Sequence, residues 1–318
     1  MSPSDTVARG LTLRVATFNV LFGHRDAGVG SWRHRRPLIE RSIESARPDI
    51  LALQEVFPSK LADMGEAVRD LEFIAGPASG PPRWGDVSVY GEQLLRMART
   101  LRLPSAAEFK GPASERMVSG EHQPIAYRAS RLRPLASGAF WISATPERAG
   151  SLLPFAPTPF LVHWARFASH DCFGSLLVCN AHFGHAPWHH GPTARIVARQ
   201  IETIASQDVD TALPETDRPI ILLLGDFNAW PSSPLVRRLT SAAGTGFVDA
   251  ARAATERVGP GVTFHWGLGS SRFGFTLDYV LSHGRIQPRR AEVIDVHDGR
   301  LYPSDHYPLV IEFESIRN

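Results

Sequence analysis

The stretch LLLGDFNAWP, residues 222–231, ends a run of aliphatic residues on a glycine and then places an acid and an amide two positions apart. The aliphatic run predicts a buried strand, and because side chains alternate across a strand, Asp226 and Asn228 are expected to share a face. Aspartate and asparagine also begin turns, so a simple turn is the alternative interpretation of the same residues. The polar residues elsewhere in the chain bear on this choice.

The bulk composition is that of a globular protein, neither disordered nor fibrous. The chain has 318 residues, 43% hydrophobic and 21% charged, and is long enough to bury a substantial core. Its 34 basic and 32 acidic residues give a net charge of +2, which provides no overall attraction to nucleic acid. The densest basic run, Arg33 to Arg36, is interpreted as the solvated start of a helix.

The cysteine content and the apolar segments indicate a cytoplasmic protein. Cys172 and Cys179 are too few for a disulfide framework and lack metal-ligand spacing. The first residues, MSPSDTVARGLTL, lack the apolar core of a signal peptide, and no stretch approaches the roughly 18 apolar residues of a membrane span. We therefore expect a cytoplasmic location and no membrane span, and no obligate protein partner is evident from the sequence.

Short apolar runs bounded by Gly, Pro, Asp or Ser recur along the chain, which is the pattern of strands. They include RVATFNV, DILALQEV, LVHWARF, SLLVCNAHF, IILLLGDF, TLDYVLS and LVIEF. Three segments have helical periodicity instead: residues 38–46, with Pro37 near the start and Pro48 closing the end, residues 89–101, and residues 191–207. Many strands with few helices predict a mixed-sheet α/β protein.

Polar residues close several of these runs. Two of them end in Asn19 and in Glu55, which alternation places on the face of Leu53, and a right-handed crossover between the two strands would bring both ends to one edge of a sheet. Other runs and one proline-flanked turn carry the same kind of residue: Asn180, His182, Asp278, Asp305 and His306. Each alone has an ordinary explanation, such as a cap or a satisfied interior histidine. Together they form a set that no core requires.

The set is chemically coherent. The carboxylates of Glu55 and Asp305, with amide oxygens, are hard ligands that suit Mg²⁺ or Mn²⁺. Such a metal neutralises charge on a phosphoryl group, and histidines with carboxylate partners would transfer protons or hold a phosphate oxygen. The chain has no GxxxxGK[ST] loop, so nucleotide-triphosphate motor chemistry is unsupported, and it has no GxSxG, CxxC or HExxH motif.

The order of these motifs resembles the endonuclease/exonuclease/phosphatase superfamily, which includes deoxyribonuclease I. The likeness runs from about Arg14 to Phe313 through RVATFNV, ILALQEV, GEHQPIAYR, NAHFGH, GDFNAWPSSP, TLDYVLS and YPSDHYPLV, and it is nearest to bacterial members of undefined substrate. It implies a single domain over residues 1–318, with a flexible N-terminus at 1–12. It also implies a four-layer α/β sandwich, in which two packed mixed β-sheets are flanked by helices and the site lies at one rim.

The resemblance further implies phosphoester hydrolysis with Mg²⁺ or Mn²⁺ as the cofactor. Glu55 would be the principal metal ligand, with Asn19 and Asp305 close to the metal or its waters. Asp226 would orient and deprotonate the attacking water, and Asn228 would hold that water or a phosphate oxygen. The substrate would be a small-molecule phosphoester or a nucleic acid.

The two histidines receive paired roles from the same resemblance. His306, supported by Asp278, would bind the phosphoryl group or transfer a proton. His182 would lie opposite, supported by Glu121 of GEHQP. A carboxylate on one imidazole nitrogen fixes the tautomer and favours the charged ring, so these pairings make electrostatic sense.

Three functions stay open on the sequence. The leading one is a metal-dependent phosphoesterase acting on phosphodiesters or phosphomonoesters, and the second is a nuclease acting on RNA or DNA, which the near-neutral charge mildly disfavours for duplex DNA. The third is a recruited, non-hydrolytic member, either a binding scaffold or a secondary-metabolism enzyme that uses the metal site for other chemistry. It is motivated by NAHFGH, where Ala181 and Gly184 stand in place of the family's threonine and aspartate.

Aromatic residues and a histidine-rich loop accompany the motifs. Five tryptophans lie near the motif segments: Trp141, Trp164, Trp188, Trp230 and Trp266. Core packing is expected for at least Trp141 and Trp164, and some of the others would wall the pocket and stack a ring or hold an apolar group. The loop containing His185, His189 and His190 is expected to be a mobile surface segment.

Overall fold

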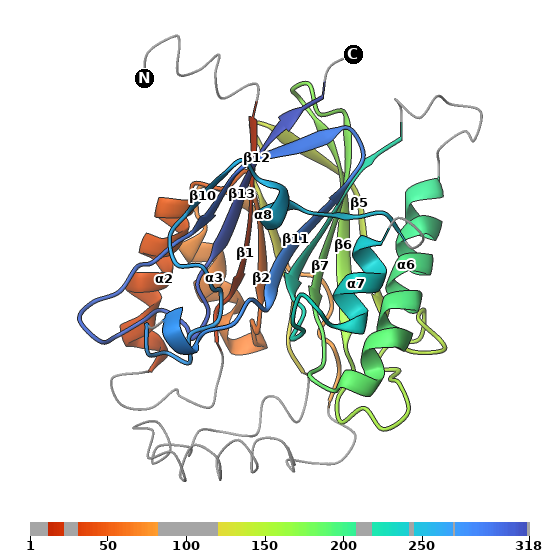
Figure 1. The fold of residues 1–318 in the computed structure, drawn as a ribbon, viewed down its shortest axis with the longest axis horizontal. Coiled ribbons are helices and arrows are strands. Elements are labelled where there is room, and N and C mark those ends of the chain that lie inside the picture. Colours follow the sequence, from red (N-terminus) through yellow and green to blue (C-terminus); the bar gives the residue numbers. More distant parts are fainter. Residues whose placement is uncertain are drawn as a thin grey trace.

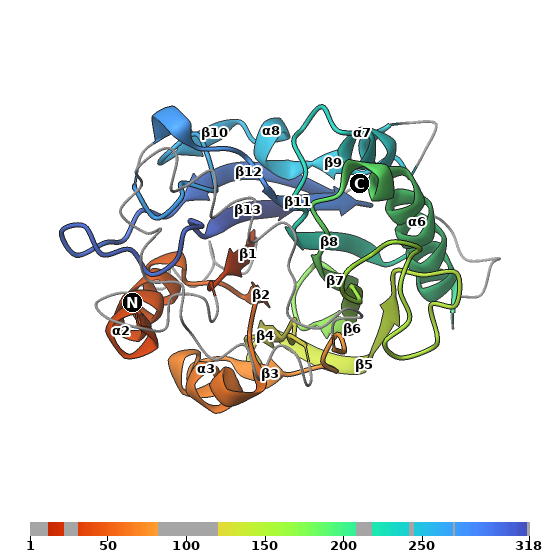
Figure 2. The ribbon, with the colours of Figure 1, turned by 90° about the horizontal axis from the view of Figure 1, so that it is seen from below.

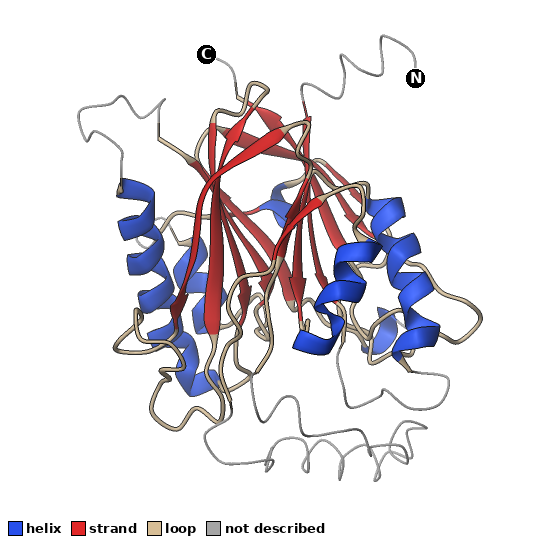
Figure 3. Ribbon diagram, turned by 180° about the vertical axis from the view of Figure 1, so that it is seen from behind, coloured by secondary structure: helices blue, strands red, loops and turns tan. Residues whose placement is uncertain are grey.

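Two β-sheets packed face to face form the centre of the molecule, and helices cover their outer faces (Figures 1 and 3). The computed structural model describes residues 12–21, 31–81, 120–207, 218–241, 245–269 and 271–316. The helix expected at 89–101 lies outside these residues. So does most of the N-terminus expected to be flexible, and Thr12 already belongs to the first strand.

The first sheet has seven strands in the order β10-β12-β13-β1-β2-β4-β3. These are β1 (Thr12–Asn19), β2 (Ile50–Gln54), β3 (Glu72–Ile74), β4 (Ile125–Tyr127), β10 (Glu256–Val258), β12 (Ile286–Val293) and β13 (Leu309–Ser315). The parallel pair β1 and β2 is connected by α2 (Trp32–Ala46), and η2 (Pro58–Lys60) and α3 (Leu61–Ala67) follow β2. This is the β–α–β opening that the sequence predicts.

The second sheet has six strands in the order β5-β6-β7-β8-β11-β9. These are β5 (Leu132–Trp141), β6 (Leu161–Ser169), β7 (Ser175–His182), β8 (Ile220–Asp226), β9 (Val248–Asp249) and β11 (Asp278–His283). The helical segments are η4 (Pro187–His189) and α6 (His190–Ser206) between the parallel β7 and β8, then α7 (Pro234–Thr240), α8 (Ala250–Ala253) and η6 (Ser271–Phe273).

Three hydrophobic clusters hold the layers together. One lies between the sheets and contains Val15, Val178 and Leu224 from β1, β7 and β8. The other two lie between each sheet and its helices, α2 and α3 on one side and α6 and α7 on the other, as Figure 2 shows from below. Strands buried on both faces give nearly continuous apolar runs, which explains why the sequence signals these strands so clearly. The fold is the predicted four-layer α/β sandwich.

Two helix starts differ from the prediction. Helix α2 begins at Trp32, so that Pro37 lies inside it, because Trp32 and Arg35 are buried and hold the first turns in place. Helix α6 begins at His190, inside the loop predicted to be mobile. His189 and His190 are both buried, and the His189 ring contacts the Pro154 carbonyl at 2.9 Å. The prediction of a mobile surface segment was therefore wrong for these two histidines.

Gly225 permits an unusually close approach of β8 to β7. Its φ is +137°, and a Cβ built on it would lie 1.8 Å from the carbonyl oxygen of Ala181. Only glycine adopts this backbone without a collision, because the obstructing atom belongs to a neighbouring strand and cannot rotate away. The group that approaches Gly225 so closely is therefore the backbone of β7.

We expect Gly225→Ala to lower the free energy of unfolding by about 3 kcal/mol or more, because it combines strain with a backbone clash. Urea denaturation followed by circular dichroism measures the loss. Gly174→Ala is the matched control, since Gly174 has a φ of +66° and nothing within 4 Å of a built Cβ. The control loses only about 1 kcal/mol, the penalty of the left-handed backbone itself. Equal losses in the two variants would contradict the proposed clash.

Candidate active site

Polar side chains from both sheets converge at the edge where β1, β2, β7 and β8 end, the lower edge in Figure 1. The register places them at one level: Asp226 is the strand partner of His182 in β7 and of Asp278 in β11. On β1, Asn19 follows the inward-facing Val15 by two alternations and so points between the sheets. The site therefore lies at the rim of the inter-sheet core.

Asp226 is the centre of this cluster and is only 1% exposed. Its Oδ2 accepts a hydrogen bond from Asn19 Nδ2 at 3.0 Å, a contact that crosses from one sheet to the other. The same oxygen lies 3.6 Å from His182 Nε2 and 3.5 Å from His306 Nε2. One buried carboxylate oxygen thus accepts one hydrogen bond and lies within ion-pair distance of two imidazoles, and the three partners come from three different strands or loops.

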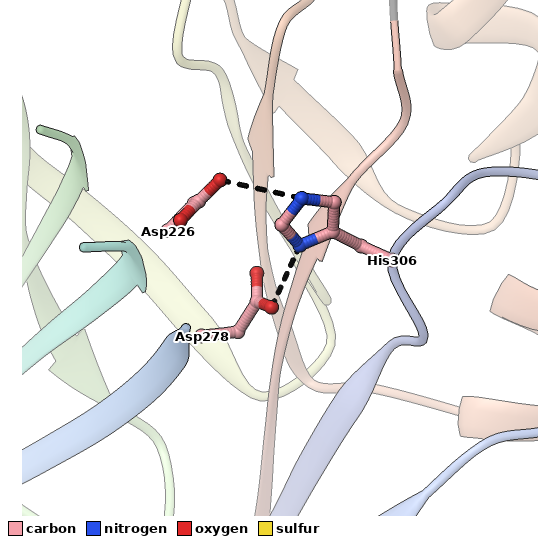
Figure 4. A group of neighbouring side chains, drawn as sticks. All are labelled: Asp226, Asp278 and His306. Carbon is pink, nitrogen blue, oxygen red and sulfur yellow. Dashed lines mark hydrogen bonds and ion pairs between the residues drawn. The ribbon is translucent and has the colours of Figure 1, made fainter. Parts of the chain in front are cut away.

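His306 lies between two aspartates, as Figure 4 shows. Its Nδ1 donates to Asp278 Oδ2 at 2.8 Å, while its Nε2 faces Asp226. Burial by itself would lower the pKa of His306, but the charges of Asp278 and Asp226 outweigh burial and raise the pKa to about 10. The ring is therefore an imidazolium at neutral pH.

His182 has a matching arrangement on the other side of Asp226. Its Nδ1 donates to Glu121 Oε1 at 2.6 Å. Burial again acts to lower the pKa of His182, but the charge of Glu121 and its hydrogen bond, followed by the charge of Asp226, raise it to about 9. Both predicted carboxylate–histidine pairs are therefore hydrogen-bonded in the structure, and the Nε2 of each ring points at Asp226.

The Glu55 side chain points in a direction that strand alternation does not predict. Leu51 and Leu53 pack toward the helices, whereas the Glu55 carboxylate accepts a hydrogen bond from Asn19 Nδ2 at 3.0 Å. The backbone of Glu55 is left-handed, with a φ of +60°, which ends the strand alternation and turns the side chain toward the site. The expectation that Glu55 shares a face with Leu53 was wrong, although its place in the site is as the sequence predicts.

Both interpretations of the GDFN stretch are partly correct: a strand that places Asp226 and Asn228 on one face, and a simple turn. The strand ends at Asp226, and the Asp226 Oδ1 accepts the backbone N–H of Asn228 at 2.9 Å, which is an Asx turn. Asn228 has a φ of +48°, and its Nδ2 donates to the carbonyl of Phe183 at 2.8 Å. The turn therefore exists, and the strand-alternation argument holds for Asp226 but not for Asn228.

Ser304 connects Asp305 and His306 to Asn19. Its hydroxyl donates to the carbonyl of Asn19 at 2.7 Å and accepts the backbone N–H of His306 at 3.1 Å. Asp305 is half-buried beside this contact, and its charge contributes to the raised pKa of His306. Ser304 was not among the residues predicted for the site, although it directly precedes Asp305 and His306.

Arg35 holds the same two segments together from behind. It is 4% exposed, and its guanidinium donates to the carbonyls of Val20, Leu21 and Pro303 at 2.8, 2.7 and 2.6 Å. The interpretation of the basic run as wholly solvated was therefore wrong for this residue. Three carbonyl acceptors spread over two distant segments are a tertiary feature, which a basic cluster in the sequence does not reveal.

Asn180, although predicted with the strand-end set, has a structural position. It is fully buried, and its Nδ2 donates to the carbonyls of Leu53 and Pro124 at 2.8 and 2.9 Å. Its Oδ1 accepts from Gln54 at 2.7 Å, so Asn180 joins the two sheets in the interior, away from the rim.

The departure from the family pattern at Gly184 has a packing reason, because a Cβ at this position would lie 2.6 Å from the ring of Phe160.

The charges of the cluster suit a divalent cation. Glu55, Asp226, Asp278, Asp305 and Glu121 outnumber the two imidazoles, so the site is net negative even with both rings protonated. Among the described residues, Asp226, Asp278 and His306 form a group whose potential ligand atoms all lie within 4.8 Å of one another. Its histidine nitrogens are already directed at the two aspartates, so the half-buried oxygens of Glu55 and Asp305 are the better donors for a hard cation.

Comparison with known proteins places this geometry in a family. The model of the Endonuclease/Exonuclease/phosphatase family matches residues 16–306, and the chain belongs to that family. No curated protein matches the chain significantly in sequence. Among the helices that the structure describes, none has the length and apolar character needed to cross a membrane.

Several solved structures share the fold. An endonuclease/exonuclease/phosphatase from Bacteroides vulgatus is 19% identical with a TM-score of 0.74, covering 96% of this chain and 99% of that one. The Bacteroides thetaiotaomicron mannosyl-6-phosphatase Bt3783 is 22% identical with a TM-score of 0.73, covering 95% and 99%. D. rerio TDP2, solved with a single-strand DNA product, is 14% identical with a TM-score of 0.62, covering 96% and 99%.

We expect Arg35→Met to lower the free energy of unfolding by about 3 kcal/mol, because it leaves buried carbonyls without their donor. Arg33→Met is the control in the same helix, since Arg33 is exposed, and it should change stability by less than about 0.5 kcal/mol. Urea denaturation of the two variants measures the difference. If Arg35→Met unfolded at the same urea concentration as Arg33→Met, the three hydrogen bonds would contribute nothing to stability.

We expect Glu121→Gln to lower the pKa of His182 well below about 9, because it removes the largest interaction that raises the pKa and leaves only the charges of Asp226 and Glu55 to oppose burial. Histidine-selective NMR titration of the chelator-treated protein measures this pKa. Glu147→Gln, at an exposed position, is the control and should leave the titration unchanged. A His182 pKa that stayed near 9 in Glu121→Gln would show that Glu121 is not the source of the shift.

Proposed function

We propose that the protein is a divalent-metal-dependent hydrolase of phosphoester bonds. The observation that supports this most directly is the pair of buried imidazoles, each held by its own carboxylate, on either side of the Asp226 carboxylate. A buried acceptor flanked by two fixed cations is suited to a reaction in which a water is deprotonated next to an anionic phosphoryl group.

In this proposal Asp226 orients and deprotonates the attacking water. Its Oδ1 accepts the backbone N–H of Asn228, and its Oδ2 accepts from Asn19 and lies beside the two imidazoles. Asn228, in the turn that follows, holds the water or a phosphate oxygen. The neighbouring carboxylates raise the pKa of both imidazoles, which makes the rings poor acceptors for the proton of the water and supports the Asp226 carboxylate as the base.

The two imidazoles bind and polarise the phosphoryl group in this proposal. Asp278 behind His306 and Glu121 behind His182 keep both rings charged and fixed in orientation. Charge-assisted N–H donors shorten and strengthen hydrogen bonds to phosphate oxygens. His306 is also placed to return a proton to the leaving oxygen, because an imidazolium is an acid.

Glu55 is the proposed principal ligand of Mg²⁺ or Mn²⁺, with Asn19 and Asp305 beside it. Three features support this: the net negative cluster, the half-exposed carboxylates of Glu55 and Asp305, and the amide of Asn19 that fixes Glu55 against Asp226. When bound, such a cation neutralises charge on the phosphoryl group and stabilises the leaving oxygen. The amide of Asn19 directs its Nδ2 at the carboxylates, so we propose that it acts mainly by positioning them.

The substrate class is left broad in this proposal, from phosphomonoesters to phosphodiesters and nucleic acids. The structural relatives include a mannosyl-6-phosphatase and a protein crystallised with a DNA product, and each of those names describes that relative alone. The net charge of +2 favours small substrates over duplex DNA. We also propose that residues 1–318 act as one domain, because the two sheets share one core, and that the protein is cytoplasmic, which its low content of two cysteines in 318 residues fits.

We expect Asp226→Asn to lower kcat by about 10²- to 10⁴-fold on bis-p-nitrophenyl phosphate or the best ester of a panel, because the amide cannot take the proton. Asp70→Asn, at an exposed position just before β3, is the matched control and should keep full activity. The panel spans nucleotides, RNA, DNA, sugar phosphates and phospholipid head groups, each with Mg²⁺, Mn²⁺ or chelator. Circular dichroism shows whether each variant is folded.

Two results would contradict the proposal. The first is equal turnover by Asp226→Asn and wild type, which would remove the assigned base. The second is a metal-loaded wild type that cleaves none of the esters, which would favour a recruited, non-hydrolytic member. Calorimetric Mn²⁺ titration separates these cases, since Glu55→Gln should weaken Mn²⁺ binding by at least about tenfold whatever the substrate is.

A further inference from the structure

The two carboxylates that hold the imidazoles are fixed in different ways. Asp278 belongs to β11, and the register of β11 with β8 makes it the strand partner of Asp226. Glu121 lies outside the regular strands and precedes β4. Its carboxylate is 12% exposed, and within the described part of the chain its only hydrogen bond is the one with His182. The position of this carboxylate is therefore set by the backbone of Glu121.

Ser79 holds the backbone of Glu121 at two points. The Ser79 N–H donates to the carbonyl of Glu121 at 2.8 Å, and the Ser79 hydroxyl accepts the N–H of Glu121 at 3.1 Å. Ser79 is buried, so the loss of either contact would leave a buried polar group without its partner. Gly120 lets the two segments come this close, because its φ is +76° and a Cβ built on it would lie 2.3 Å from Ser79 Oγ.

Trp141 fixes Ser79 in turn. It is the last residue of β5, at the end of that strand that is level with the site. Its indole N–H donates to the carbonyl of Ser79 at 2.7 Å. The ring is buried, as core packing predicts, but packing alone does not require the indole nitrogen to face this carbonyl. Hydrogen bonds therefore connect Trp141 through Ser79 and Glu121 to His182, and we call Ser79 and Trp141 the Glu121 anchor.

The Glu121 anchor also bears on the position of Glu55. His122 forms β-bridges with Val56 on one side and with Ala78 on the other, so the strand order β2-β4-β3 continues beyond the strands to the rim. The His122 N–H donates to the Val56 carbonyl at 2.7 Å, and the Val56 N–H donates back at 3.3 Å. The residues that directly follow Glu55 and Glu121 are thus bonded to each other. The same backbone contacts relate both carboxylates.

We propose that Ser79 and Trp141 are positioning residues, which act on the reaction through the Glu121 carboxylate and the direction of the His182 ring. This inference rests on the proposed function for the role of His182 at the phosphoryl group. It adds to that function the contacts that hold the imidazole in its working orientation.

The expected effect follows from the geometry of hydrogen bonds. A hydrogen bond weakens steeply as its angle departs from linearity, so a displaced Glu121 would leave the His182 ring less firmly oriented. Misplacement of a group by about 1 Å lowers a rate by up to about 10²-fold. Interactions that stabilise developing charge in the transition state raise kcat rather than lower KM, so the loss should fall on kcat.

Two variants remove the two links of the Glu121 anchor. Ser79→Ala removes the acceptor of the Glu121 N–H, and Trp141→Phe removes the indole donor while it keeps an aromatic ring. On the ester that the wild type hydrolyses best, with Mg²⁺, we expect each variant to lower kcat by about threefold to tenfold, the effect of one ordinary hydrogen bond. The KM should change by less than about twofold.

Proton NMR of the chelator-treated full chain reports the hydrogen bond between His182 and Glu121 without any reaction. A proton in a short hydrogen bond between an imidazole and a carboxylate resonates far downfield, so the Nδ1 protons of His182 and His306 should each give such a signal. Glu121→Gln and Asp278→Asn assign the two signals, because each removes one carboxylate. Both variants of the Glu121 anchor should shift the His182 signal upfield and leave the His306 signal in place.

Matched controls make the same chemical changes elsewhere in the chain. Ser42→Ala removes a buried hydroxyl that donates to the carbonyl of Leu38 at 2.8 Å within α2. Trp164→Phe removes, on β6, an indole for which the described residues provide no hydrogen bond. Both controls should keep the wild-type kcat and both downfield signals. Circular dichroism shows whether each variant is folded.

A double substitution tests whether Ser79 acts through Glu121. In the Glu121→Gln background, where the charged acceptor is already lost, Ser79→Ala should lower kcat no further. A full additional loss would show another route and overturn the proposal. An unchanged His182 signal in both anchor variants would also overturn it, as would an equal shift of the His306 signal, which indicates a general loss of packing. If Ser79→Ala does not fold, Trp141→Phe in the same background decides the question.

The results separate this inference from the proposed function. A shifted His182 signal in variants of a protein that hydrolyses no ester would keep the link from Ser79 to His182 and overturn the hydrolase. Hydrolysis that both anchor variants leave at the wild-type kcat would keep the hydrolase and overturn the positioning role.

Discussion

The arrangement of the site follows from one constraint, the burial of the Asp226 carboxylate at the rim between two sheets. A carboxylate that is 1% exposed needs donors and opposite charge, because an unpaired buried charge is strongly destabilising. The donors come from separate parts of the chain: Asn19 from the first sheet, His182 from the neighbouring strand, and His306 from a loop near the C-terminus. Satisfying one charge therefore brings together residues that are up to about 290 positions apart in sequence and fixes the two sheet edges against each other.

The histidines extend this constraint outward, because each charged ring beside Asp226 needs a carboxylate of its own. The result is an alternating series of acid and imidazole, from Glu121 through His182 and Asp226 to His306 and Asp278. His163 shows what happens without such a carboxylate. It is equally buried, its Nδ1 contacts only the carbonyl of Gln123 among the hydrogen bonds described, and burial lowers its pKa to about 4. The charge on the rings of His182 and His306 is thus produced by their carboxylate partners, since burial alone lowers the pKa of a histidine.

The sequence was most informative where strands are buried on both faces and least informative where the backbone leaves the regular strand. The strands that carry Asn19, His182 and Asp226 were predicted because their apolar runs are continuous, but β12 was missed because exposed Gln287 and Arg289 interrupt its buried residues. The facing of Glu55 was wrong because a single left-handed residue cancels the alternation rule. The strand-end set could be found from residue type and position alone, whereas Arg35 acts through carbonyls that only the folded chain brings within reach.

Left-handed backbone is concentrated where the strands turn into the site. Of the described non-glycine residues with positive φ, Glu55 and Asn228 carry site side chains, and the Leu21 carbonyl accepts from the Arg35 guanidinium. Trp266, also with positive φ, packs on Phe264, whose ring lies beside that of His306. Each such residue costs about 1–2 kcal/mol relative to an ordinary conformation, so the surrounding structure has to impose it. The three core clusters provide that support, because the strands leading into these turns are packed on both faces. The packed layers therefore hold the carboxylate of Glu55, the turn after Asp226 and the rings beside His306 in positions that relaxed strands would not give them.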